Sequence, residues 1–153
     1  MKIPIRYGLL TAFGFIAWVL VTHSLFSPRS LVFSFTGPLS AILHFTMTYL
    51  GLKALEREKD EPPRFKEALK TGVSIGLVYG LTASLFFVVA FFGFRADWLA
   101  SEPMAETTPK SLRLVLAFGG MIVGAVLLGL VYSAVIAFFI AKRRSAEMGD
   151  SGY

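Results

Sequence analysis

The residue in this sequence with the clearest capacity for chemistry is His44, which lies in the middle of an apolar stretch. On a helix, the residues that share its face are small or polar: Gly37, Ser40, Ala41, Thr48 and Gly51. Tyr79 and Tyr132, in two later apolar stretches, are candidate partners from other helices. The sequence therefore predicts a polar site inside a membrane, formed by His44, Thr48, Tyr79 and Tyr132.

Two interpretations of His44 are open. A buried imidazole can relay protons or bind a metal, and ionisable groups inside a membrane are functional candidates by default. A neutral imidazole that forms a hydrogen bond with a threonine or tyrosine hydroxyl is equally consistent with a structural role. We favour the structural interpretation, because a single histidine without a carboxylate nearby needs no more than one such partner.

A second pattern consists of small residues at every fourth position, at Gly72, Gly76, Gly80 and Ser84. A later stretch repeats this spacing at Ala125, Gly129, Ser133 and Ala137, with Gly120 and Gly124 nearby. Small residues let two helix backbones approach closely, which is how helices associate in lipid. We expect these two ridges to pack against each other or against a second copy of the chain.

Other kinds of site are not indicated. The chain has no cysteine, and none of its ten Asp and Glu residues falls inside an expected span. Ser40 precedes His44 by one helical turn, but no third residue would orient the histidine for hydrolysis. The sequence therefore predicts no catalytic residue, no metal site and no cofactor, and a protein that is not an enzyme.

The composition places the chain in a membrane. Hydrophobic residues make up 55% of the sequence and charged residues 16%, far from the globular average. Four stretches are long enough to cross the roughly 30 Å hydrocarbon core as helices: about 5–25, 37–55, 73–94 and 112–141. The expected fold is all-α, a four-helix transmembrane bundle of two helical hairpins in one domain, 1–144, followed by a flexible cytoplasmic tail, 145–153. Gly37-Pro38 suits the start of the second helix, although a start at Leu31 with a kink at this pair is the alternative.

Orientation follows from the basic residues. The N-terminus, the loop at 56–71 with its flanks, and the tail together hold eleven Lys and Arg, namely Lys2, Arg6, Lys53, Arg57, Lys59, Arg64, Lys66, Lys70, Lys142, Arg143 and Arg144. The two other connections hold four, namely Arg29, Arg95, Lys110 and Arg113. The positive-inside rule then places both termini in the cytoplasm.

Two motifs resemble a known family. The segments YLGLKAL at 49–55 and FKEALKTG at 65–72 are similar to those of the bacterial family called domain of unknown function 4199, and a looser likeness extends over most of the chain. The members of that family are small proteins with four expected spans. The resemblance implies a location in the bacterial inner membrane, but it brings no activity and no site residues.

Two functions remain in competition. The first is a non-enzymatic scaffold or accessory subunit that binds membrane lipids and associates with itself or with another membrane protein. The second is a small oligomeric carrier or channel whose path passes His44. Nucleic acid is not an expected partner, because the basic residues sit at the ends of apolar stretches and not in a basic, aromatic-rich surface.

Overall fold

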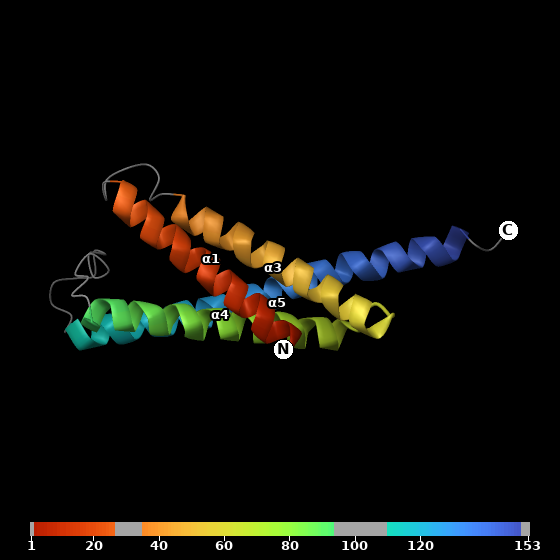
Figure 1. The fold of residues 1–153 in the computed structure, drawn as a ribbon. Helices are drawn as coiled ribbons and strands as arrows, with labels where there is room; N and C mark the ends of the chain where they lie inside the picture. Colours follow the sequence, from red (N-terminus) through yellow and green to blue (C-terminus); the bar gives the residue numbers. More distant parts are fainter. Residues whose placement is uncertain (1, 27–34, 94–109, 151–153) are drawn as a thin grey trace.

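The computed structural model describes residues 2–26, 35–93 and 110–150, and over these residues the chain forms four α-helices. They are α1 (Ile3–Leu25), α3 (Thr36–Lys59), α4 (Phe65–Gly93) and α5 (Lys110–Asp150), shown in Figure 1. For this part of the chain, the predicted all-α class with four helices is confirmed.

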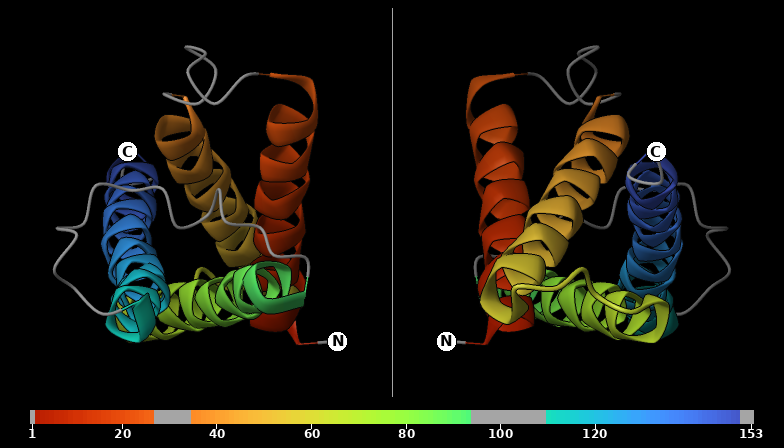
Figure 2. Two further views of the ribbon diagram at one scale, coloured as in Figure 1. Left: turned by 90° about the vertical axis from the view of Figure 1, so that its left-hand side faces the viewer. Right: turned by 90° about the vertical axis from the view of Figure 1, so that its right-hand side faces the viewer.

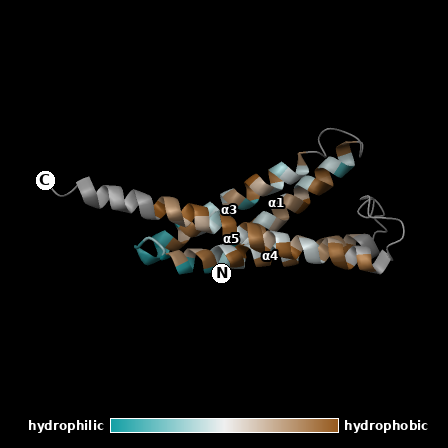
Figure 3. Ribbon diagram, turned by 180° about the vertical axis from the view of Figure 1, so that it is seen from behind, coloured by the Kyte–Doolittle hydropathy of each residue, from teal (hydrophilic) through white to brown (hydrophobic). Residues whose placement is uncertain are grey.

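Three helices within the described residues are long and apolar enough to cross a membrane: α1 over Ile3–Leu25, α4 over Phe65–Ala90 and α5 over Val115–Ile140. Large apolar side chains such as Phe13, Leu85 and Phe138 are more than half exposed. Apolar colouring covers most of these three helices, while the turn between α3 and α4 is strongly hydrophilic (Figure 3). Such extensive apolar exposure is typical of a lipid-facing surface. The chain is a small multi-pass membrane protein.

Helix α3 differs from these three. Its 24 residues would extend about 36 Å at 1.5 Å per residue, enough to cross a bilayer. Yet it carries His44 and several hydroxyl groups, and it ends in charged residues from Lys53 onward. These polar groups keep α3 out of the set of clearly apolar helices, so hydropathy supports three of the four predicted spans.

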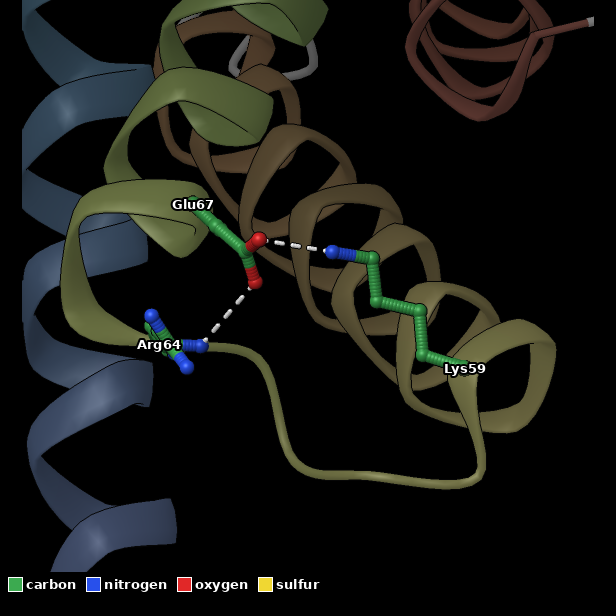
Figure 4. A network of polar contacts seen from close by, with 3 residues as sticks. All are labelled: Lys59, Arg64 and Glu67. Carbon is green, nitrogen blue, oxygen red and sulfur yellow. Dashed lines mark hydrogen bonds and ion pairs between the residues drawn. The ribbon is translucent and has the colours of Figure 1, made fainter.

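The turn between α3 and α4 is held by local polar contacts (Figure 4). Asp60 has a φ of 53° and ends α3 in the left-handed conformation. Beyond it, the Arg64 backbone N–H donates to Glu67 Oε2 at 3.3 Å, and Lys59 Nζ pairs with Glu67 Oε1 at 2.6 Å. A Glu at the third helical position that accepts from the backbone N–H of the residue before the helix forms half of a capping box, and this contact stabilises the start of α4 at Phe65.

Several predicted helix bounds need correction. Helix α4 begins before the predicted start at 73, and α3 continues to Lys59 instead of ending at 55. Helix α5 extends from Lys110 to Asp150, so residues 145–150 of the predicted flexible tail are helical. Hydropathy marks where a chain leaves lipid, whereas backbone hydrogen bonds can continue a helix into water.

The start of α3 agrees with the Gly37-Pro38 expectation. Pro38 lies in the first turn of α3, where the missing N–H would lack an intrahelical partner in any case. The alternative start at Leu31 lies outside the described residues. The remaining predicted bounds differ little, since α1 begins at Ile3 instead of residue 5.

The contacts fix the relative directions of the helices. Helices α1 and α4 run the same way, because Gly8 lies against Ile75 and Val78 while Phe15 packs its ring against Phe87. Helices α4 and α5 run in opposite directions, as described below. Figure 2 shows α1 and α5 on opposite sides, with α3 between them and α4 beneath; α3 packs against all three other helices.

The buried core contains many small residues. One cluster joins Ala12, Tyr79, Ala83 and Ala125 from α1, α4 and α5. A second cluster, nearer the α3–α4 turn, joins Leu52, Ala68, Ile136 and Ala137. Five of these eight residues are alanines, which are not bulky enough to separate the helices, since alanine adds only one carbon to the backbone. The helices can therefore lie close together.

Candidate functional site

The polar site predicted around His44 lies where α3 meets α4 and α5. The inward face of α3 buries His44 and, one turn later, Thr48, whose exposed fractions are 1% and 0%. From α4, the ring of Tyr79 packs against the imidazole at 61°, with 5.2 Å between the ring centroids. From α5, the ring of Tyr132 does so at 80°, with 5.5 Å between centroids. The structure thus brings His44, Tyr79 and Tyr132 into contact and places Thr48 on the same face of α3.

The polar atoms of this site lack hydrogen bonds. Among the described residues, Nδ1 and Nε2 of His44 and Oγ1 of Thr48 are buried and have no hydrogen-bond partner. The hydrogen bond to a threonine or tyrosine hydroxyl that a structural role predicts is therefore not formed. Both tyrosines contact the imidazole through near-perpendicular ring packing instead. A buried polar group without a partner costs about 1–3 kcal/mol, which distinguishes this site from the other buried polar groups described below.

Other buried threonines show what an ordinary arrangement looks like. Thr11 Oγ1 donates to the Tyr7 carbonyl at 2.8 Å, and Thr22 Oγ1 donates to the Trp18 carbonyl at 2.9 Å. Each bond spans one helical turn, which is the usual solution for threonine inside a helix. Thr48 does not make this bond, so its hydroxyl is available to another group.

The site offers few ligands for a metal ion. Within the described residues, no group of three or more His, Cys, Asp or Glu side chains lies close enough together to hold one. The groups that the structure places beside His44 are the rings of Tyr79 and Tyr132 and, one turn along α3, the Thr48 hydroxyl. The chemistry that this arrangement can carry is hydrogen bonding to a small neutral molecule or the passage of a proton along an imidazole.

The predicted small-residue ridge of α4 lies against α5. A Cβ added at Gly80 would approach Ile122 Cα to 2.9 Å, and one added at Gly76 would collide with the Ala125 carbonyl. At the other end, Gly72 lies against Gly129 and Ser133. Residues later in α4 contact residues earlier in α5, which shows that the two helices are antiparallel. Backbone meets backbone here, and only residues without a side chain permit that approach.

The two serines of the predicted ridges are both buried. Ser84 Oγ donates to the Phe118 carbonyl of α5 at 3.2 Å, which adds a hydrogen bond between the helices. Ser133 Oγ donates within its own helix, to the Leu130 carbonyl at 3.0 Å. In lipid an interhelical bond of this kind is worth about 0.6 kcal/mol on average.

Gly120 and Gly124 lie apart from this contact. A Cβ at either position would have no heavy atom within 4 Å. They face away from α4, because α5 turns about 100° per residue and the face used for packing carries Ala125, Gly129 and Ser133 instead. The structure gives these two glycines no packing role within the described chain.

Three further close approaches involve glycine, of which sequence reasoning missed those of Gly8 and Gly14, whereas it had placed Gly51 on the inward face of His44. A Cβ added at Gly8 would lie 2.6 Å from Val78 Cβ, one at Gly14 would lie 2.9 Å from Leu43 Cδ2, and one at Gly51 would lie 2.7 Å from Ile75 Cδ1. They join α1 to α4, α1 to α3 and α3 to α4. The spacing of Gly8 and Ala12, four residues apart and both buried, was the available signal for the first.

No family model, curated protein or solved structure matches this chain. The class of the protein therefore depends on the fold and the apolar helices alone. The resemblance to the domain of unknown function 4199 stays a prediction.

Proposed function

We propose that the protein is a non-enzymatic scaffold or accessory subunit that crosses a membrane four times, with both termini in the cytoplasm. The observation that carries this proposal is the enclosure of the His44 imidazole, which is 1% exposed between the rings of Tyr79 and Tyr132. A path for a solute would need an opening at this point.

The parallel arrangement of α1 and α4 supports a fourth crossing by α3. Two spans that follow each other in the chain and run the same way need a return segment between them. Helix α3 meets the end of α1 at one side, where Trp18 Nε1 donates to Thr36 Oγ1 at 3.4 Å. It meets the start of α4 at the other side through Lys59 and Glu67. Both termini then lie on one side, and the eleven basic residues of that side favour the cytoplasm.

The location and the partners are also proposals. We propose a location in a bacterial inner membrane, which rests on the resemblance of residues 49–55 and 65–72 to the domain of unknown function 4199 family. We propose as partners the surrounding lipids and either a second copy or another membrane protein, and not nucleic acid. The outward apolar surfaces of α4 and α5 support contacts of this kind.

A carrier or channel is the second candidate, and one observation favours it. The two imidazole nitrogens of His44 and the Thr48 hydroxyl are buried one turn apart without partners, which is the arrangement expected of a site that receives a proton or a small hydrogen-bonding solute. Passage would require Tyr79 or Tyr132 to move aside.

Proton flux into vesicles separates the two candidates. The full chain is reconstituted into liposomes with a pH-sensitive dye inside, and a pH step is applied outside. For a scaffold we expect the same rate as in protein-free liposomes, both for the wild-type chain and for His44→Gln. A wild-type rate well above that of empty liposomes, lost in His44→Gln and kept in the matched variant Thr22→Val, would establish the carrier.

A scaffold also requires a partner. We expect the wild-type chain, purified in a mild detergent, to retain either a second copy or one other membrane protein in fixed stoichiometry, as measured by native mass spectrometry. A monomer without any retained protein, combined with proton flux, would contradict the scaffold.

A further inference from the structure

Helices α3 and α5 form an apolar groove on the surface of the protein. Its volume is about 390 Å³, and its walls are Phe45 and Tyr49 of α3 and Val135, Ile136, Phe139 and Ile140 of α5. This volume falls in the usual range for small-ligand sites, about 300–1,000 Å³. Phe139 is 63% exposed and Tyr49 is 43% exposed, so the groove opens sideways toward the surroundings of the bundle and not into its interior.

The groove has a basic end. Helices α3 and α5 run the same way, because Phe45 packs against Tyr132 and, farther along both helices, Leu52 lies in one cluster with Ile136. On α3, the exposed residues Lys53 and Arg57 continue the row of Phe45 and Tyr49 at intervals of four.

In the sequence of α5, basic residues also follow the residues of the groove wall. Arg143 and Arg144 occupy the helix positions four residues after Phe139 and Ile140. Lys142 immediately precedes them. Glu56 and Glu58 flank Arg57, but the helix positions in line with the groove are basic on both helices.

We propose that this groove binds an anionic phospholipid, with an acyl chain along the apolar walls and the phosphate at the basic end beside Lys53. Charge complementarity identifies the ligand. A phosphodiester without a compensating cation gains about 1 kcal/mol from each nearby Lys or Arg at a membrane surface. A zwitterionic lipid fills the same walls but gains less at the basic end.

The position of the groove along the helices agrees with this ligand. In the sequence, the apolar run of α5 gives way to Lys142, Arg143 and Arg144 directly after Ala141, one turn beyond Phe139 of the groove wall. The walls therefore lie within the hydrocarbon and the basic positions lie at the level of the headgroups. Tyr49 lies one turn before Lys53, which suits the tyrosine preference for the membrane interface. The proposal requires a membrane surface at this end, and it holds for a scaffold and for a carrier.

The test is lipid binding to the full chain in a mild detergent, measured by native mass spectrometry. The probes are phosphatidylglycerol and phosphatidylcholine with identical acyl chains. We expect the wild-type chain to retain phosphatidylglycerol at least fivefold more than phosphatidylcholine. Soluble glycerol phosphate, which has no acyl chain, should not compete. Equal retention of the two lipids, or full competition by glycerol phosphate, would overturn the proposal.

Variants locate the binding. Lys53→Gln should lower the retention of phosphatidylglycerol about fivefold and leave phosphatidylcholine unchanged. The matched control is Lys66→Gln, an exposed lysine of α4 outside the groove. If both variants lose the same amount of phosphatidylglycerol retention, the preference for the anionic lipid comes from overall charge, and the proposed groove site is wrong.

Filling the groove gives an independent readout. Val135→Phe adds a ring to the wall and should lower the retention of both lipids. Val123→Phe adds the same ring at an exposed position of α5 away from the groove and should leave retention unchanged. Circular dichroism checks that both variants remain helical. Unchanged lipid retention in Val135→Phe together with a loss of a dimer would assign the groove to a second copy, and unchanged retention without that loss would also overturn the lipid site.

Discussion

The α4–α5 interface and the His44 face of α3 are both buried, but they are built from opposite kinds of residues. At the α4–α5 interface, Gly76 allows the backbones to touch, and Ser84 donates a hydrogen bond to the facing helix. On α3, the imidazole of His44 and the hydroxyl of Thr48 are enclosed without a partner. Lipid removes the hydrophobic drive between helices, so close backbone contact supplies the attraction at the first region. In the second region, the buried polar atoms have no hydrogen bonds to offset their burial. Polar positions of this kind inside a membrane are candidates for function.

The comparison depends first on whether α3 crosses the membrane at all. The chain has no cysteine of its own, so single cysteines report on one position each. We expect an impermeant thiol reagent to label Phe26→Cys fully in intact cells and to leave Glu61→Cys unlabelled until the cells are opened. The reason is that α3 separates these two exposed positions and, in the proposed topology, returns the chain to the cytoplasm.

Each other labelling result has a distinct meaning. Labelling of both cysteines in intact cells, or of neither, would show that α3 stays on one side. Labelling of Glu61→Cys alone would invert the orientation while keeping the crossing.

The next largest effect should come from the glycine contact. Gly76→Leu places a side chain against the Ala125 backbone and must force α4 and α5 apart. We expect a loss of about 3 kcal/mol in the free energy of unfolding, at the upper end of the cost of overpacking, seen as a lower unfolding temperature in detergent.

The matched control for this variant is Gly124→Leu on α5. Its Cβ would have no heavy atom within 4 Å, and leucine favours a helix over glycine by somewhat less than 1 kcal/mol. We expect it to be neutral or slightly stabilising. An equal loss of stability in both variants would mean that Gly124 also lies in a contact. The distinction between a packed face of α5 with Gly129 and an unpacked face with Gly124 would then be wrong.

Two threonine variants test the His44 face of α3, the second region of the comparison. Thr48→Val removes a buried hydroxyl that has no partner, so we expect stability to be unchanged or to rise by up to about 1 kcal/mol. Thr22→Val removes a hydroxyl that donates to the Trp18 carbonyl at 2.9 Å, so we expect a loss of about 1 kcal/mol. Both replacements keep the β-branched shape, and both are measured by chemical unfolding in detergent.

This pair also bears on function. A clear loss of stability in Thr48→Val would show that its hydroxyl is engaged in the membrane by a group such as a solute or a water molecule. The His44 face would then be a satisfied site, and the contrast with the α4–α5 interface would disappear.

The smallest effect should come from the ion pair at the α3–α4 turn. Lys59 and Glu67 lie 2.6 Å apart, but both side chains are about two-fifths exposed, and exposed pairs contribute little. We expect Lys59→Gln to leave the unfolding temperature unchanged within error, at low and at high salt. A large, salt-sensitive decrease would show that this exposed ion pair contributes to stability on the scale of the α4–α5 glycine contact, against the expected order of effects.

The sequence predicted much of this fold because its signals are strong. Long apolar stretches gave the helices, and the spacing of Gly72, Gly76 and Gly80 identified the side of α4 that meets α5. The side of α5 was harder to predict, since two small-residue rows run along it. One contains Gly120 and Gly124, and the other contains Gly129, and only the packed structure distinguishes them.

The candidate site was also predicted from the sequence only in part. The helical spacing of His44 and Thr48 predicted a common inward face, and the two tyrosines were correctly identified as neighbours of His44. The missing hydrogen bonds could not be predicted. Ring orientation depends on how three helices cross, and no local pattern in one helix contains that information.

The parallel contact between α1 and α4 has a consequence for biosynthesis. A ribosome delivers α1 to the membrane well before α4, so Gly8 has no Val78 to meet until the turn after α3 has been made. Helices α4 and α5, by contrast, are neighbours in the chain and can join as a hairpin as soon as both have inserted. In the proposed topology with four crossings, the first two helices therefore wait in the bilayer for the last two. During that interval the imidazole of His44 lacks its covering rings from Tyr79 and Tyr132, which makes late insertion of the second hairpin the step that closes the protein.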